Sequence, residues 1–259
     1  MAWCEIRFPK RSLTNSKTIR WLNNLGLVAL NSIFVRLLFP AAAVGMAVFA
    51  QQHGWGFFNY FEIPMFLSIL ICIILLDGAI YFQHVLMHAI PGFWLLHRMH
   101  HTDMDFDVTT GSRFHPIEII LSMLYKFAVI VMLGAPAVAV LIFEIVLNGS
   151  AMFNHSNVSI PKSIDRILRR LIVTPDMHRI HHSVLEHETN SNFGFSLSIW
   201  DRIFGTYLEN PEKGHKEMTI GIDEFRDTKF LTLPWMLAQP FLGKVSKYVL
   251  NRRTWKNQK

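Results

Sequence analysis

The sequence has few cysteines and few charged residues for its length. Only two of its 259 residues are cysteine, Cys4 and Cys72, which excludes a disulfide framework and a cysteine-based metal site. Charged residues make up 17% of the chain, whereas an average soluble domain has about 25%. A glycine-rich nucleotide fingerprint and a haem-attachment motif are both absent, so we expect no intrinsic nucleotide or haem. The N-terminus has no short apolar core typical of a cleaved signal peptide.

Apolar residues are instead abundant and occur in long runs. They make up 51% of the chain, and residues 25–50 and 63–82 form runs long enough to cross a bilayer. Residues 117–153 are too many for one crossing and contain the turn signal Gly134-Ala135-Pro136, which predicts a hairpin of two short spans. We therefore predict an all-α integral membrane helical bundle with about four transmembrane helices.

The distribution of basic residues predicts which side of the membrane each segment occupies. Residues 51–62 contain no Lys or Arg, whereas residues 1–24 contain five. By the positive-inside rule the N-terminus is cytoplasmic, and the hairpin returns the later histidines to the same face. With a net charge of +6 concentrated near the ends of apolar runs, a lipid surface is a better partner than nucleic acid.

A single domain over residues 1–259 accommodates this organisation. Residues 1–24 form a cytoplasmic N-terminal segment, and residues 25–153 hold the transmembrane helices with the first two histidine clusters. Residues 154–229 form a cytoplasmic helical cap with the third cluster, and residues 230–259 form an interfacial basic tail.

Two opposite charges lie within the predicted hairpin. Lys126 and Glu144 are each nine residues from Ala135, on opposite arms, so an antiparallel hairpin places them at similar depth. A paired charge costs less in a bilayer than an isolated one, which predicts an ion pair. The alternative is that Lys126 reaches the membrane surface and Glu144 faces a polar interior.

Eight histidines form three clusters with helical spacing. The clusters are His84 and His88; His97, His100 and His101; and His178, His181 and His182. Residues three and four apart share a helix face, so each cluster directs its imidazoles at one point. Isolated histidines such as His53, His187 and His215 fit surface or loop positions.

The clusters supply more ligands than one structural zinc ion needs, because such a site takes four. His115 and His155 flank the hairpin at the same membrane surface and bring the candidate metal ligands to ten; each is alternatively a donor to a ligand ring. Two six-coordinate ions use twelve donors, which leaves positions for water, dioxygen or substrate. The pattern indicates a dimetal site, for which imidazole suits iron, zinc and copper.

The chain resembles the fatty acid hydroxylase / sterol desaturase superfamily of membrane di-iron enzymes over residues 65–210. The resemblance rests on the three clusters and on further matching positions. These are Asp77, Tyr81, Arg113-Phe114-His115-Pro116-Ile117-Glu118, His155-Ser156-Asn157, Thr174-Pro175-Asp176-Met177, Asn192-Phe193-Gly194 and Trp200-Asp201-Arg202-Ile203-Phe204-Gly205-Thr206.

The resemblance implies a lipid hydroxylase or desaturase that uses two iron ions, O2 and external electrons on a sterol, a fatty acyl chain or a similar lipid. It implies that the eight clustered histidines are catalytic metal ligands and that His115 and His155 are additional ones. The electron donor is then a separate cytochrome b5, ferredoxin or reductase. A basic surface formed by Arg166, Arg169 and Arg170 could bind such a donor; alternatively these three arginines only contact lipid headgroups. Zinc is expected to replace iron readily during purification.

Three polar residues near the clusters are candidates for orienting the ligand imidazoles through the second ring nitrogen. These are Asp176, Asn192 and Asp201, and Asp176 could equally cap the helix that carries His178. The sequence identifies no substrate-binding residue. The competing functions are a non-enzymatic metal- or haem-binding membrane protein or transporter, and a zinc hydrolase at the membrane surface.

Overall fold

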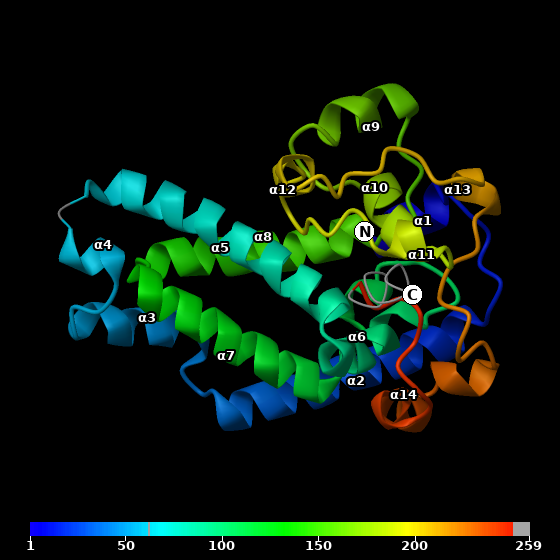
Figure 1. Ribbon diagram of the computed structural model, residues 1–259, viewed down its shortest axis with the longest axis horizontal. Helices are drawn as coiled ribbons and strands as arrows, with labels where there is room; N and C mark the ends of the chain where they lie inside the picture. The colour runs from blue at the N-terminus through cyan, green and yellow to red at the C-terminus, as the bar shows by residue number, and fades with distance from the viewer. Residues whose placement is uncertain (62, 251–259) are drawn as a thin grey trace, which may run out of the picture.

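The described residues of the computed structural model, 1–61 and 63–250, are helical and contain no β-strand beyond isolated bridges (Figure 1). The α-helices are α1 (Ala2–Arg7), α2 (Lys17–Leu38), α3 (Ala42–Gln52), α4 (Phe57–Tyr60), α5 (Met65–Ala89), α6 (Pro91–His101), α7 (Pro116–Leu133), α8 (Ala137–Asn154), α9 (Lys162–Leu168), α10 (Pro175–His181), α11 (Glu186–Thr189), α12 (Ile199–Ile203), α13 (Gly214–Glu217) and α14 (Leu233–Ala238). Three 3-10 turns, η1 (Thr110–Ser112), η2 (Thr228–Leu231) and η3 (Gln239–Phe241), complete the fold.

Four segments of the described chain are long and apolar enough to cross a membrane, which confirms the predicted architecture. They are Lys17–Tyr60, Met65–Ala89, Pro116–Leu133 and Ala137–Asn154. The first segment is not one helix, because Pro40 separates α2 from α3. Proline lacks an amide hydrogen and disfavours helical geometry in the residue before it, and Phe39 accordingly leaves the helical region.

The predicted hairpin is present as α7 and α8. Gly134 ends α7 in the left-handed conformation that glycine adopts at low cost, and Pro136 directly precedes α8. A Cβ atom on Gly134 would lie 2.6 Å from the carbonyl oxygen of Trp55, so this turn packs closely on the loop that follows α3. Both connections therefore lie together at one end of the bundle.

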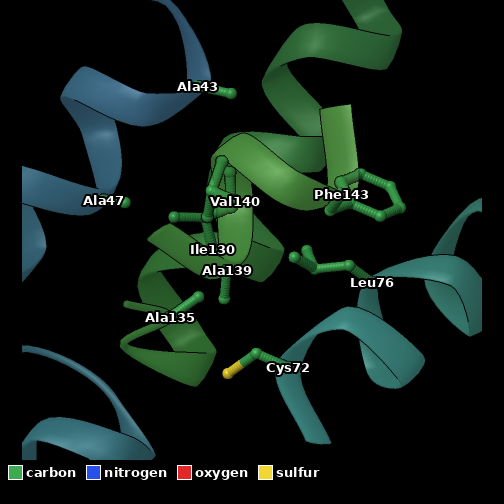
Figure 2. Packing of buried hydrophobic residues seen from close by; sticks show 9 residues of the cluster. All are labelled: Ala43, Ala47, Cys72, Leu76, Ile130, Ala135, Ala139, Val140 and Phe143. Atoms are coloured by element: carbon green, nitrogen blue, oxygen red, sulfur yellow. The ribbon is translucent and has the colours of Figure 1, made fainter. Parts of the chain in front are cut away.

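Small side chains allow the membrane helices to approach closely. The core contains Ala43 and Ala47 from α3 and Ala139 from α8, which pack with Ile130 and Leu76 in the cluster of Figure 2. In a bilayer, where lipid tails are as apolar as leucine, such close packing is a main source of helix association.

The predicted ion pair between the two hairpin arms is also present. Lys126 Nζ lies 2.6 Å from Glu144 Oε1, with side chains 10% and 25% exposed. The prediction of a pair is confirmed, and the alternative of two separate charges is wrong.

A cap of short helices lies at the other end of the bundle, where Figure 1 places α9 to α14 together with the N-terminus. Pro91 separates the helices that carry the first two histidine clusters, since α5 ends at Ala89 and α6 begins at Pro91. Buried arginines join distant segments of the cap: Arg20 bonds Asp103 and Asp107, and Arg98 donates to the carbonyl oxygen of Gln239.

The predicted interfacial tail is only partly a surface segment. Tyr248 and Val249 are fully buried against Trp94 and Ile222 of the cap. The tail residues from 251 onward, which include Arg252, Arg253, Lys256 and Lys259, lie outside the described residues.

Candidate metal centre

The fold brings nine histidines into two adjacent buried groups. The first histidine group is His84, His88, His97, His101 and His181, and the second histidine group is His100, His155, His178 and His182. Within each group, one nitrogen from every ring lies within 4.8 Å of all the others. The rings of His101 and His182 stack at 4.6 Å between centroids, so the two groups adjoin each other.

The helical spacing of the sequence explains how the groups form, but each three-histidine cluster serves both. On α6, His97 and His101 are four residues apart and face the first group, while His100 faces the second. The reverse holds at α10, where His178 and His182 face the second group and His181 the first. Each of the two helices therefore contributes histidines to both groups.

Hydrogen bonds hold the rings of the first group in a defined tautomer. The Nδ1 atom of His84 lies 2.8 Å from the carbonyl oxygen of Phe193, and that of His181 lies 2.8 Å from the carbonyl oxygen of Ser191. A carbonyl oxygen only accepts, so each Nδ1 carries the hydrogen and donates it. Their Nε2 lone pairs are then directed into the site.

Side chains orient two further rings of this group. His97 Nδ1 lies 2.6 Å from Glu118 Oε1, and His88 Nδ1 lies 3.2 Å from Asn190 Oδ1. Asn190 also donates to the carbonyl oxygen of Tyr248, which links the buried C-terminal segment to a ring of the first group. A carboxylate partner additionally raises the basicity of an imidazole toward a metal.

Many of the histidine nitrogens in the two groups have no hydrogen-bond partner among the described residues. They include Nε2 of His84, His88, His97, His101, His181 and His182. A buried polar atom without a partner costs about 1–3 kcal/mol, and repeating that cost in one place is unusual unless a ligand satisfies the atoms. Neutral imidazole nitrogens suit iron, zinc and copper, so the donor set fits metal binding.

In the second group, the short distances between Nε2 atoms also indicate a position for a cation. His155 Nε2 lies 3.2 Å from His100 Nε2 and 3.0 Å from His178 Nε2. His155 Nδ1 donates to the carbonyl oxygen of Ala151 at 2.9 Å, so its Nε2 holds a lone pair. Nitrogen atoms this close are stable with a shared proton or around a cation.

Electrostatics keep the cap histidines neutral and therefore able to act as ligands. Burial lowers the pKa of His155 and of His181 to about 3. Burial, followed by repulsion from neighbouring imidazoles, holds the pKa of His101 and His182 well below the ordinary value. Near neutral pH these rings are unprotonated, so a proton does not compete with a metal ion for their lone pairs.

His115 is separated from both groups. Its Nδ1 accepts a hydrogen bond from the backbone of Ile117 and caps α7, and its Nε2 lies 3.3 Å from the carbonyl oxygen of Leu237. Both ring nitrogens thus have partners. The Nδ1 contact arises because Pro116 begins α7 and leaves His115 at the N-cap position. His115 therefore belongs to neither histidine group. His53, His187 and His215 also lie outside the two groups.

The three polar residues expected to orient ligands do not touch a ligand ring directly. Asp176 pairs with Lys10 and Arg179. Asn192 donates to the carbonyl oxygens of Met177 and Leu208, and Asp201 accepts from the backbone of Phe193 and Gly194. Asp201 therefore acts through the backbone whose carbonyl oxygen holds His84. The direct partners Glu118 and Asn190 were not predicted, although Glu118 has a sequence signal, a carboxylate in the first turn of an apolar helix.

A cavity of about 780 Å³ leads from the histidines into the membrane helices. His84, His97, His100 and His178 lie on its wall, and the rest of the lining comes mainly from α2, α5, α7 and α8. Leu25, Val28, Ile80, Met87 and Met123 make much of this wall apolar. The volume suits a lipid chain, and four of the clustered histidines line the cavity.

Comparisons with known proteins agree with this geometry. The profile of the family described as fatty acid hydroxylase matches residues 69–206, more than half of the chain. The chain is 28% identical over 218 residues to ornithine lipid hydroxylase OlsE of Rhizobium tropici, covering 83% of this chain and 62% of that protein.

Two further relatives are eukaryotic. Alkylglycerol monooxygenase of Xenopus tropicalis is 24% identical over 216 residues, covering 78% of this chain and 45% of its own length. Cholesterol 25-hydroxylase of Rattus norvegicus is 27% identical over 150 residues, covering 56% and 48%. The chain thus spans less than two thirds of each of these three relatives. No solved structure matches it.

Proposed function

This chain belongs to the fatty acid hydroxylase family, and on that premise we propose that it is a membrane-bound oxygenase that uses O2 to hydroxylate a lipid. The observation that carries the proposal is the position of the two histidine groups at the end of a largely apolar cavity within the membrane helices. Three relatives named as lipid hydroxylases or monooxygenases favour hydroxylation over desaturation.

The two groups are proposed to hold one iron ion each. His84, His88, His97, His101 and His181 would bind the first, and His100, His155, His178 and His182 the second. When bound, the irons supply the activation of O2 and the oxidation of a C–H bond, chemistry that side chains alone do not provide. Zinc binds the same donors more strongly than ferrous iron and is expected in preparations grown without added iron.

The contribution of the protein itself is to orient the ligands and the substrate. Carbonyl oxygens of Phe193, Ser191 and Ala151 fix three ligand rings, so those rings need little reorganisation when a metal binds. The apolar wall of the cavity excludes water and holds a lipid chain against His84 and His97. Positioning of this kind makes one carbon the preferred site of reaction.

Electrons are proposed to come from a separate protein such as a cytochrome b5, a ferredoxin or a reductase. Arg166 and Arg170 are exposed on the cap and favour an acidic donor. Arg169, expected to join them, is instead buried and paired with Asp165. We propose that this face is cytoplasmic, because the basic N-terminal segment lies with the cap and the loop at the other end has no Lys or Arg.

The decisive experiment is lipid analysis of cells with and without the gene, grown with iron under 18O2. A lipid that carries 18O only when the protein is present supports hydroxylation, and a new double bond without label supports desaturation. A His178→Ala variant should remove the product, while a variant of the exposed His53 should not. Protein that binds metal but yields no oxygen-dependent product would contradict an enzymatic function.

A further inference from the structure

An arginine without a partner lines the membrane-level part of the cavity. Arg36 is in the last turn of α2, is exposed, and belongs to the cavity wall. Among the described residues, no hydrogen bond or ion pair to its guanidinium is found. Arginine is rare within membrane-spanning segments, and where it occurs it normally faces a cavity and marks a functional position.

The other charges of the cavity wall already have partners. Lys126 and Glu144 neutralise each other at 2.6 Å, and Glu118 bonds the His97 ring at the opposite end of the cavity. The membrane-level wall therefore carries one uncompensated positive charge, on Arg36. Uncharged polar groups, among them Ser32 and Asn148, lie on the same wall.

Helix geometry places these charges well away from the histidines. Lys126 is eight residues beyond Glu118 on α7, which corresponds to about 12 Å along the axis at 1.5 Å per residue. Glu144 precedes Asn154 by ten residues on α8, or about 15 Å. On α2, Asn31 bonds the carbonyl oxygen of Phe114 just before α7 begins, and Arg36 lies five residues further on.

We propose that Arg36 binds the anionic group of the lipid substrate, a carboxylate or a phosphodiester, inside this cavity. The apolar chain of that lipid then runs along Ile80, Met87 and Met123 to the histidine groups. The inference rests on the proposed function for the identity of the reaction, but the binding step stands without it. It implies that the oxidised carbon lies along the apolar chain of the lipid, away from the anionic group rather than next to it.

Equilibrium binding to the purified full-length protein in a neutral detergent tests the proposal. The probes are radiolabelled hexadecanoate, dihexadecanoyl phosphatidylglycerol and hexadecanol, which supply a carboxylate, a phosphodiester and an uncharged control. A hydrogen bond to a charged group is worth about 1.5–3 kcal/mol, so Arg36→Gln should lower the affinity for an anionic probe about tenfold or more. Hexadecanol binding should stay within about twofold, and the weakened probe identifies the anionic group.

A variant of the ion pair gives an effect of opposite sign, and a second variant gives a control. Glu144→Gln removes the carboxylate that neutralises Lys126, so the protein should bind the same anionic probe with higher affinity. The control is Arg7→Gln, which alters an exposed arginine outside the cavity wall and should leave affinity unchanged. Unchanged binding of both anionic probes to Arg36→Gln, or equal loss of hexadecanol, overturns the proposal. Retained binding without any oxygenated product would instead count against the proposed function.

Discussion

Glu118 offers the sharpest test of how the protein prepares the first histidine group. Its carboxylate is 3% exposed and accepts from His97 Nδ1 at 2.6 Å. Glu118→Gln keeps an acceptor oxygen but removes the negative charge, whereas Glu118→Ala removes the acceptor. Loss of such a ligand partner typically lowers metal affinity 10–100-fold, which corresponds to about 1.4–2.8 kcal/mol. We expect Gln near the lower and Ala near the upper end of that range.

Metal content measured against a competing chelator checks this prediction. The first group, whose His97 ring Glu118 contacts, should lose its metal at a lower chelator concentration than in the unaltered protein. Glu209→Gln, an exposed carboxylate, is the matched control and should bind metal like the unaltered protein. Equal affinities in all three variants would refute the role of Glu118.

Three further predictions concern stability and ligand identity. His155→Ala should lower metal content in the second group and abolish product formation, whereas His115→Ala should keep both metals and lose about 0.5–2 kcal/mol of stability as a helix cap, seen by metal analysis and thermal unfolding. Lys126→Ala should lower stability in detergent by about 1–3 kcal/mol, and the Lys126→Glu/Glu144→Lys exchange should recover most of it; equal losses would argue against the ion pair. Gly56→Ala should lower the thermal midpoint clearly, because its Cβ would lie 2.1 Å from the backbone nitrogen of Gly134, while Gly92→Ala, with open space around it, should not.

Local chemistry made much of the architecture predictable from the sequence. Gly134 and Pro136 carry strong backbone preferences, so the hairpin follows from a few residues. Lys126 and Glu144 could be paired because a bilayer penalises a lone charge. Histidines spaced by four residues share a helix face whatever the tertiary fold, so the gathering of the clustered histidines could be predicted from their spacing.

The remaining features depend on contacts between distant segments. The carbonyl oxygens that hold His84 and His181 come from residues 193 and 191, and backbone groups have no sequence signature. The assignment of His100 to a different group from its neighbours depends on the approach of α10 to α6, which spacing along one helix does not give. His115 lies outside both groups, because its ring caps the helix that Pro116 begins, a role that its spacing in the sequence does not distinguish from metal binding.

Because α6 and α10 each contribute histidines to both groups, the two metal sites would not assemble independently. An ion in the first group would fix both helices through His97, His101 and His181, and this would also place His100 and His178 for the second group. The entropic cost of ordering the helices would thus be met at the first binding event, so the second ion should bind more tightly than the first. Loading should therefore be positively cooperative, and partly filled protein should be scarce in a titration followed by native mass spectrometry.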